Sequence, residues 1–122
     1  MSKLIFTQGQ KILFQGDSIT DCGRRDQPYT PFGFGYFLFC ASMIQARYPH
    51  LDLRFDNRGI SGDTVPSLMA RWEADAINEQ PDWMSCLIGI NDASHVWQHR
   101  PGFEAKTPDL YLTNYRGLLQ QM

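Results

Sequence analysis

The sequence predicts an α/β fold built on a parallel sheet, and three features support this prediction. Residues 11–15, 51–56 and 82–88 have the length and the β-branched or aromatic content of strands. Each is followed by a polar segment that contains glycine, and then by a longer run with helical character. Strands and helices that alternate in this order favour parallel pairing with right-handed crossover connections.

The first strand, residues 11–15, runs directly into Gly16, Asp17 and Ser18. Glycine at position 16 permits a tight turn that a side chain would obstruct. Aspartate and serine are the residue types that accept hydrogen bonds from backbone donors where a strand turns into a loop or helix. A serine at the carboxyl end of a parallel strand lies where open α/β sheets place their active sites. Residues 4–7 are expected to form a short lead-in strand.

Three helices are expected after the strands. The first begins near residue 34, is apolar on most sides, and stops at Pro49. The second covers about residues 66–79 and carries an apolar stripe at helical spacing. The third, residues 109–121, is amphipathic and begins after a Thr-Pro-Asp sequence typical of a helix start. The aromatic residues at the start of the first helix are expected in the core: Phe34, Tyr36, Phe37 and Phe39.

The remaining segments are expected to be loops. Residues 16–33 form a long polar stretch, and residues 93–106 carry two of the histidines, a proline and a glycine. In residues 57–64, two glycines and several short polar residues predict a tight turn. The N-cap of the helix that follows this turn could be any of three residues, Ser61, Asp63 or Thr64.

Three polar, glycine-bearing segments follow the three strands: Gly-Asp-Ser at 16–18, Ser-Gly-Asp at 61–63 and Gly-Ile-Asn-Asp at 89–92. Because the carboxyl ends of parallel strands share one edge, we expect Ser18, Gly62 and Asn91 to converge. A serine hydroxyl is a nucleophile, and a glycine N–H and an asparagine amide are donors suited to an oxyanion. The pattern therefore points to acyl transfer at this edge.

The composition excludes several functional classes. Hydrophobic residues make up 43% of the chain and charged residues 20%, which is typical of a folded globular domain. The net charge is −2, without a basic stripe, so neither nucleic acid nor an anionic membrane is an expected partner. The apolar run near the N-terminus is too short for a secretion signal, and no run has transmembrane length. A cytoplasmic protein is expected.

The cysteines and acidic residues predict no cofactor and no metal. The three cysteines fit no zinc spacing; Cys40 and Cys86 lie in apolar runs and are expected to be buried free thiols, whereas Cys22 lies in a polar loop near Ser18. Gly33 and Gly35 do not follow a strand directly and do not complete a dinucleotide-binding pattern. A nucleotide-binding domain is therefore disfavoured.

The sequences GDSIT, SGDT and GIND resemble the first three conserved blocks of the SGNH/GDSL hydrolase superfamily. The longer stretches GDSITDCGRR, NRGISGDTV and IGIND resemble the branch that contains bacterial acetylxylan esterases and related carbohydrate deacetylases. The resemblance covers essentially all of residues 1–122 as one domain. It implies a flavodoxin-like three-layer α/β/α sandwich with a parallel sheet, here ending after the third strand and its following helix.

The resemblance also implies a mechanism and a site. Ser18 would attack an acyl ester and form an acyl-enzyme, and its own N–H, the Gly62 N–H and the Asn91 side chain would form the oxyanion hole. Asp17 would support the turn that carries Ser18. The substrate would be a small-molecule or saccharide ester, and the reaction would need no cofactor and no metal.

The same resemblance implies a fourth block, Asp-x-x-His near the C-terminus, which would supply the general base and its aspartate partner. This C-terminal block is absent, so the hydrolase domain is expected to be incomplete and the chain alone inactive or very weak. The histidines present are His50, His95 and His99, and whether one of them substitutes for the base stays open. The alternative function is a binding module that keeps the pocket without a base.

The order of strands in the superfamily has a further implication. There the strands lie in the order second, first, third, fourth, fifth, so the third strand is internal, whereas here its outer edge, at residues 82–88, would be open. An apolar, unpaired strand edge is a template for pairing with another chain. Self-association through this edge is therefore expected.

Overall fold

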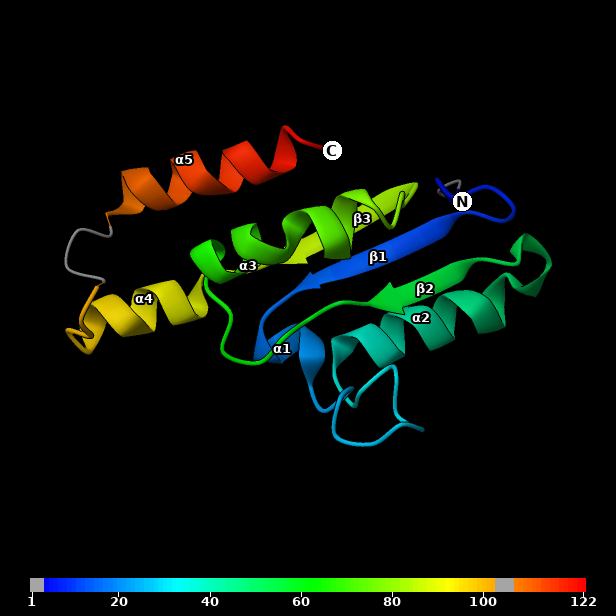
Figure 1. Cartoon of the computed structure of the whole chain (residues 1–122). Coiled ribbons are helices and arrows are strands. Elements are labelled where there is room, and N and C mark those ends of the chain that lie inside the picture. The colour runs from blue at the N-terminus through cyan, green and yellow to red at the C-terminus, as the bar shows by residue number, and fades with distance from the viewer. Residues whose placement is uncertain (1–3, 103–106) are drawn as a thin grey trace.

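The computed structural model describes residues 4–102 and 107–122 and contains a three-stranded parallel sheet (Figure 1). The strands are β1 (Lys11–Gly16), β2 (Arg54–Asn57) and β3 (Trp83–Leu87), in the order β2-β1-β3. Lys11 lies opposite Arg54, and Ile12 lies opposite Trp83. The predicted strands and the α/β class are confirmed, and the central strand is the one that leads to Ser18.

Helices connect the strands and extend beyond the last one (Figure 1). They are α1 (Ser18–Asp21), α2 (Tyr36–Arg47), the 3₁₀ turn η1 (Pro49–Leu51), α3 (Val65–Trp72), the π-helical turn η2 (Glu73–Ile77), α4 (Ile90–Trp97) and α5 (Pro108–Leu119). The predicted helix over residues 66–79 is thus α3 continued by η2. The other two predicted helices correspond to α2 and α5.

The helices cover the two faces of the sheet, because successive residues of β1 point to opposite faces. On one face, Ile12 and Phe14 pack with α2 through Phe37, which is fully buried. On the other face, Leu13 packs with α3 and α5 in a cluster that includes the buried Trp72. The three-layer α/β/α arrangement is therefore confirmed, with one helix on the first face and two on the second.

Capping residues define where α3 and α5 begin. The Thr64 hydroxyl accepts a hydrogen bond from the Ser67 N–H at 3.4 Å, so Thr64 is the N-cap among the three predicted candidates. The Thr107 hydroxyl accepts from the Leu110 N–H at 3.2 Å, as the Thr-Pro-Asp sequence predicts. These caps place the first turn of each helix against the carboxyl edge of the sheet.

The predicted loops at residues 16–33 and 93–106 are wrong in part, since α1 lies in the first and α4 runs into the second. Helix α1 is a single turn, which is too short to show a periodic pattern. Helix α4 contains asparagine, aspartate, serine and histidine, which have low helix propensity. Residues 103–106 of the second predicted loop lie outside the described residues.

Two smaller expectations are also corrected. Residues 4–7 form no strand; instead Phe6 packs edge-on against Trp83, and the Gly9 N–H donates to the Leu51 carbonyl at 2.8 Å. Phe34 and Phe39 are 63% and 62% exposed, so they are not core residues. Helix α2 buries only one face against the sheet, and Phe39 lies on the opposite face.

Strand β3 is an edge strand in the part of the chain that the structure describes. Its first and last residues, Trp83 and Leu87, are 39% and 46% exposed. Helix α5 packs on the face of the sheet that α3 also covers. There the Tyr115 hydroxyl donates to the Cys86 carbonyl at 2.9 Å. The Tyr111 hydroxyl likewise donates to the Ile88 carbonyl at 2.7 Å. The two tyrosines therefore attach α5 to β3.

Within residues 4–102 and 107–122, no helix combines the length and the apolar content that crossing a bilayer would require. The same residues contain no group of three or more histidine, cysteine, aspartate or glutamate side chains placed to hold a metal ion. All three cysteines are free and half-buried.

Candidate functional site

Ser18 is the first residue of α1, directly after the turn that ends β1. A Cβ at Gly16 would lie 2.4 Å from the Leu87 carbonyl oxygen, so only glycine lets the strand end this close to β3. Asp17 is buried, and its carboxylate accepts the Ile19 N–H at 3.0 Å as the N-cap of α1. The Ser18 side chain is exposed. The local structure therefore presents Ser18 to solvent on a capped, buried turn.

Gly62 lies in the turn between β2 and α3, at the same edge of the sheet. Its φ angle is +88°, a left-handed conformation that glycine adopts without strain. No atom lies within 4 Å of the position that a Cβ would occupy. The backbone at Gly62 is therefore exposed and open to the approach of a substrate.

Hydrogen bonds join the Ser18 segment to the Gly62 segment. The Ile60 N–H donates to the Gly16 carbonyl at 3.0 Å, which extends the β1–β2 pairing past the strand ends. The Ser61 N–H and hydroxyl both donate to Asp21 Oδ2, at 2.8 and 2.9 Å. The turn before Gly62 is thus attached both to the end of β1 and to α1.

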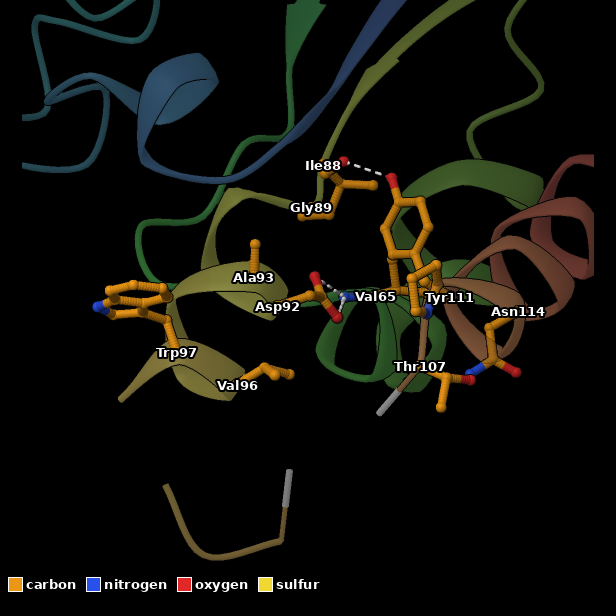
Figure 2. A pocket seen from close by; sticks show the side chains of 11 residues that line it. Val65, Ile88, Gly89, Asp92, Ala93, Val96, Trp97, Thr107, Tyr111 and Asn114 are labelled. Carbon is orange, nitrogen blue, oxygen red and sulfur yellow. Dashed lines mark hydrogen bonds between the residues drawn. The ribbon is translucent and has the colours of Figure 1, made fainter. Parts of the chain in front are cut away.

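Asn91 and Asp92, in the first turn of α4, join the third segment to the second. Asn91 Nδ2 donates to the Asp63 carbonyl at 2.9 Å. Both carboxylate oxygens of Asp92 accept the Val65 N–H, at 3.1 and 3.0 Å, as Figure 2 shows. Because an asparagine amide carries two N–H donors, the bond to Asp63 orients the group and leaves a second donor for a ligand.

A network of hydrogen bonds from Arg71 holds the turn at Asp63 in place. Arg71 Nε donates to Asp63 Oδ2 at 2.8 Å, and its Nη1 donates to Gln15 and to Asp75, each at 3.0 Å. Gln15 is fully buried on the central strand. Since the guanidinium group has fixed geometry, it holds the Asp63 side chain in place relative to β1. The three segments at the carboxyl edge are therefore parts of one hydrogen-bonded unit.

Two titratable groups near this edge have shifted pKa values. Burial alone would raise the pKa of Asp21, but hydrogen bonds from Ser61 and the nearby Arg25 outweigh it and lower that pKa below its usual value. Burial raises the pKa of the Cys86 thiol, which opposes a nucleophilic role for it. At neutral pH, Asp21 is a carboxylate and Cys86 is a thiol.

A cavity of about 560 Å³ lies between α4 and α5, near the end of β3 (Figure 2). It is mainly apolar, and its lining includes Ile88, Val96, Trp97 and Tyr111. Ser18, Gly62 and Asn91 are not among its lining residues. The site predicted from the sequence therefore lies outside this cavity, on the three turns at the carboxyl edge of the sheet.

The histidines occupy different positions relative to this edge. His50 lies in η1, before the start of β2, at the opposite end of the sheet. His95 lies one helical turn after Asn91 on the same face of α4, and its Nε2 is 3.4 Å from Arg100 Nη1. His99 follows α4 and is exposed. Of the three, His95 is the one that shares a helix face with a predicted site residue.

Two features of the site are not among the predictions made above, and the first of them is visible in the sequence itself. Asp92 and His95 do have Asp-x-x-His spacing, although they lie in α4 rather than near the C-terminus. The Asp92 carboxylate is engaged by Val65, which favours a structural role for it. Asp21 is the second feature: it lies three residues after Ser18 and binds Ser61, a contact that only the fold brings about.

Comparisons with known proteins identify relatives of this chain. The GDSL-like Lipase/Acylhydrolase family matches residues 14–122. An acetylxylan esterase from Geobacillus stearothermophilus is 44% identical over 118 residues, which are 93% of this chain and 52% of that protein. A crystal structure of a catalytic mutant of that organism's acetylxylan esterase Axe2 has a TM-score of 0.88 at 41% identity, covering 97% of this chain and 56% of that one.

A candidate GDSL-like lipase from Parabacteroides merdae has a TM-score of 0.86 at 41% identity, covering 98% of this chain and 56% of that one. The chain thus spans about half the length of the relatives that it matches. The family match extends over nearly the whole chain and includes all three turns of the carboxyl edge. This chain therefore belongs to the GDSL-like lipase/acylhydrolase family.

Proposed function

We propose that this chain carries the nucleophile and the oxyanion hole of a serine ester hydrolase. The observation that carries the proposal is the hydrogen-bonded unit formed by the three turns, with Ser18, Gly62 and Asn91 each at the carboxyl end of a strand. Ser18 is exposed, Gly62 has open space beside it, and Asn91 retains a donor.

In the proposed reaction, Ser18 Oγ attacks the ester carbonyl carbon as a general base removes the hydroxyl proton. The carbonyl oxygen becomes an oxyanion, which accepts hydrogen bonds from the Ser18 N–H, the Gly62 N–H and Asn91 Nδ2. Collapse of this intermediate breaks the ester C–O bond, and the base returns its proton to the leaving oxygen, so that the alcohol departs and an acyl group stays on Ser18. Water, activated by the same base, then attacks this acyl group and releases the carboxylic acid and free Ser18. Asp17 keeps the serine turn in place by capping α1. Donors directed at the developing oxyanion are typically the largest single contribution to such catalysis.

We propose that the general base is an aspartate–histidine pair outside these 122 residues. Crystal structures of Axe2 include variants called catalytic mutants, in which a serine, an aspartate or a histidine is replaced, and the aspartate is three residues before the histidine. Within this chain, Asp92 and His95 have that spacing, but the Asp92 carboxylate already accepts the Val65 N–H. His95 is therefore the internal competitor that an experiment must exclude.

The substrate class proposed is an acetylated saccharide, as the relatives' acetylxylan esterase activity suggests. The second candidate function is a binding module without turnover. It is favoured because the Asp92 carboxylate, which has the spacing of a partner for His95, accepts the Val65 N–H instead. Calorimetric titration with acetylated xylo-oligosaccharide separates the two. Binding without any acylation of Ser18, even with imidazole as an external base, supports the module, whereas acylation supports the hydrolase.

The central experiment measures whether Ser18 is reactive. The 122-residue chain is treated with a fluorophosphonate, with and without imidazole as an external base, and the modified peptide is identified by mass spectrometry. We expect labelling at Ser18 that imidazole accelerates and that Ser18→Ala abolishes. Ser42→Ala, which removes an exposed serine of α2, serves as the matched control. Absence of labelling at Ser18 under all conditions would overturn the proposal.

A parallel assay assigns the base. We expect p-nitrophenyl acetate hydrolysis by the chain alone to be barely above background, and His95→Ala to leave it unchanged. Loss of a triad member leaves about 10³–10⁴-fold acceleration over water in serine hydrolases, which sets the scale of this residual activity. A large loss on His95→Ala would identify His95 as the base and refute an external one.

We also propose that the chain self-associates through the outer edge of β3, since Trp83 and Leu87 are exposed there. A strand edge with apolar side chains offers both backbone pairing and apolar contact to a second copy. The corresponding test is given in the Discussion.

A further inference from the structure

Asp21 is a buried acidic residue for which the proposed reaction has no direct use. It is the last residue of α1, three residues after Ser18, and is only 3% exposed. Its Oδ2 accepts hydrogen bonds from the Ser61 N–H at 2.8 Å, from the Ser61 hydroxyl at 2.9 Å, and from Arg25 Nε at 3.3 Å. Its Oδ1 is buried and has no hydrogen-bond partner among the described residues.

A buried carboxylate is costly unless its surroundings compensate the charge. Burial acts to raise the pKa of Asp21. The two hydrogen bonds from Ser61 and the charge of Arg25 act to lower it, and the net result is a pKa below the usual value. Asp21 is therefore ionised at neutral pH. Hydrogen bonds to an ionised acceptor are about twice as strong as neutral ones, so the link to Ser61 is a strong one.

The hydrogen bonds between Asp21 and Ser61 matter because of where Ser61 lies in the chain. Ser61 immediately precedes Gly62, and Asp21 binds both its backbone N–H and its side chain. The peptide group that carries the Gly62 N–H begins at the carbonyl carbon of Ser61. Gly62 itself has a φ of +88°, and no atom lies within 4 Å of the position that a Cβ would occupy. The Asp63 N–H donates to the Ile60 carbonyl at 3.2 Å, which closes a turn around that peptide group. Its orientation therefore depends on this turn and on the bonds that hold Ser61.

Helix α1 and the turn after β2 are in close contact around Asp21. A Cβ at Gly59 would lie 2.4 Å from the Asp21 nitrogen. Arg24 Nε donates to the Gly59 carbonyl at 2.7 Å, and Asn57 Nδ2 donates to the Thr20 carbonyl at 2.7 Å. Helix α1 and the turn after β2 thus approach each other backbone to backbone, and Asp21 supplies the charged contact between them.

We propose that Asp21 is a positioning residue for acyl transfer: it holds Ser61 so that the Gly62 N–H is directed at the oxyanion formed on Ser18. The proposal rests on the proposed function, since it assigns Gly62 to the oxyanion hole. Because Asp21 and the nucleophile belong to the same helical turn, one rigid element places both the attacking oxygen and, through Ser61, an oxyanion donor. The Asp21 charge is offset by Ser61 and Arg25, which limits its repulsion of the oxyanion.

The test compares Asp21→Ala, Asp21→Asn and the control Arg25→Gln, which removes the ion pair but keeps both Ser61 hydrogen bonds. Fluorophosphonate labelling of Ser18, with imidazole as external base, gives a maximal labelling rate and a half-saturating probe concentration. For Asp21→Ala we expect a maximal rate lowered about 10²-fold, the scale of a misplaced reacting geometry, with the half-saturating concentration unchanged. Asp21→Asn, which keeps an oxygen acceptor, restores most of the rate. Arg25→Gln stays within about twofold, because the Arg25 side chain is half-exposed and solvent screens its charge.

A second measurement does not depend on reactivity. Amide hydrogen exchange at Ser61 is expected to accelerate at least tenfold in Asp21→Ala and to stay unchanged in Arg25→Gln. If wild-type Ser18 is never labelled, the proposed function fails, and this exchange measurement still decides whether Asp21 orders Ser61. Normal labelling rates in folded Asp21→Ala would overturn the positioning role. Loss of cooperative thermal unfolding in both Asp21 variants would also overturn it, because Asp21 would then serve the fold as a whole.

Discussion

Asn91 donates a side-chain hydrogen bond to the backbone carbonyl of Asp63 at 2.9 Å, and this bond connects the turn after β3 to the turn after β2. Arg71 holds the Asp63 side chain at 2.8 Å from the other direction. The amide of Asn91 is therefore oriented by a residue adjacent to Gly62. Two of the three proposed oxyanion donors are thus placed by one turn of the chain.

Replacement of Asn91 tests this arrangement. We expect Asn91→Ala to lower the rate of Ser18 acylation by about 10²–10³-fold, the usual effect of removing one oxyanion donor. Asn91→Asp is expected to be at least as slow, because a carboxylate cannot donate and would repel both the Asp63 carbonyl and the oxyanion. Acylation is measured by stopped-flow with p-nitrophenyl acetate and imidazole. Asn114→Ala, on α5, is the control, and equal rates for Asn91→Ala and wild type would remove Asn91 from the oxyanion hole.

Gly59→Ala tests the close approach of α1 to the turn after β2. A Cβ at position 59 would lie 2.4 Å from the backbone nitrogen of Asp21, so the two segments must separate. We expect a loss of about 1–3 kcal/mol in the free energy of unfolding, as for other overpacked sites. Gly117→Ala, in α5 with no atom within 4 Å of the new Cβ, is expected to be neutral or stabilising by up to about 1 kcal/mol. Urea titration measures both; a neutral Gly59→Ala would contradict the packing described.

Leu87→Lys tests self-association through β3. Leu87 is 46% exposed at the end of the edge strand, and a lysine there places charge on the surface that a second copy would cover. We expect sedimentation velocity to show a concentration-dependent oligomer for the wild type and a monomer for Leu87→Lys. Met69→Lys is a matched control, since Met69 is also 46% exposed but lies on α3. A wild-type monomer at all concentrations, or equal effects of both lysines, would exclude the β3 edge as the interface.

Tyr115→Phe tests the attachment of α5 to β3 at high pH. Burial, the charge of the neighbouring Cys86 and a side-chain hydrogen bond with it raise the pKa of Tyr115 to about 12. Since an unfolded tyrosine titrates near 10, the folded state binds more protons between pH 10 and 12, and stability falls as the pH rises through this range. Tyr115→Phe is expected to cost about 1 kcal/mol at neutral pH, the value of one hydrogen bond, and to flatten this alkaline loss. A steep alkaline loss that persists in Tyr115→Phe would assign it to other groups.

The parts of the fold that sequence patterns predict well are those set by local chemistry. Apolar runs located the three strands, and Thr107 with its following proline located the start of α5. The strand order, with the Ser18 strand in the centre, follows from the family resemblance rather than from the runs themselves. These features depend on periodicity and capping, which are visible within a few residues.

The rest depends on tertiary contacts. Helix α4 consists largely of residues with low helix propensity and is held by the bonds from Asn91 and Asp92 to the turn after β2. Phe34 and Phe39 belong to an aromatic run that is typical of a core, but Phe34 precedes α2 and Phe39 lies on the face of α2 that the sheet does not cover. Asp21 looks like a loop residue, since its partner Ser61 is far away in the sequence. No local pattern reports such pairings.

The strand order has a consequence for how the molecule assembles during synthesis. The serine-bearing strand is made first, yet it is the centre of the sheet and needs one neighbour on each side. The site beside Ser18 is therefore complete only after β2 and then β3 have been synthesised, because each of these strands is followed by one further turn of the site. Until then, the exposed sides of β1 lack partners, so a nascent chain that has released only β1 and α2 is the species that we expect chaperones to bind.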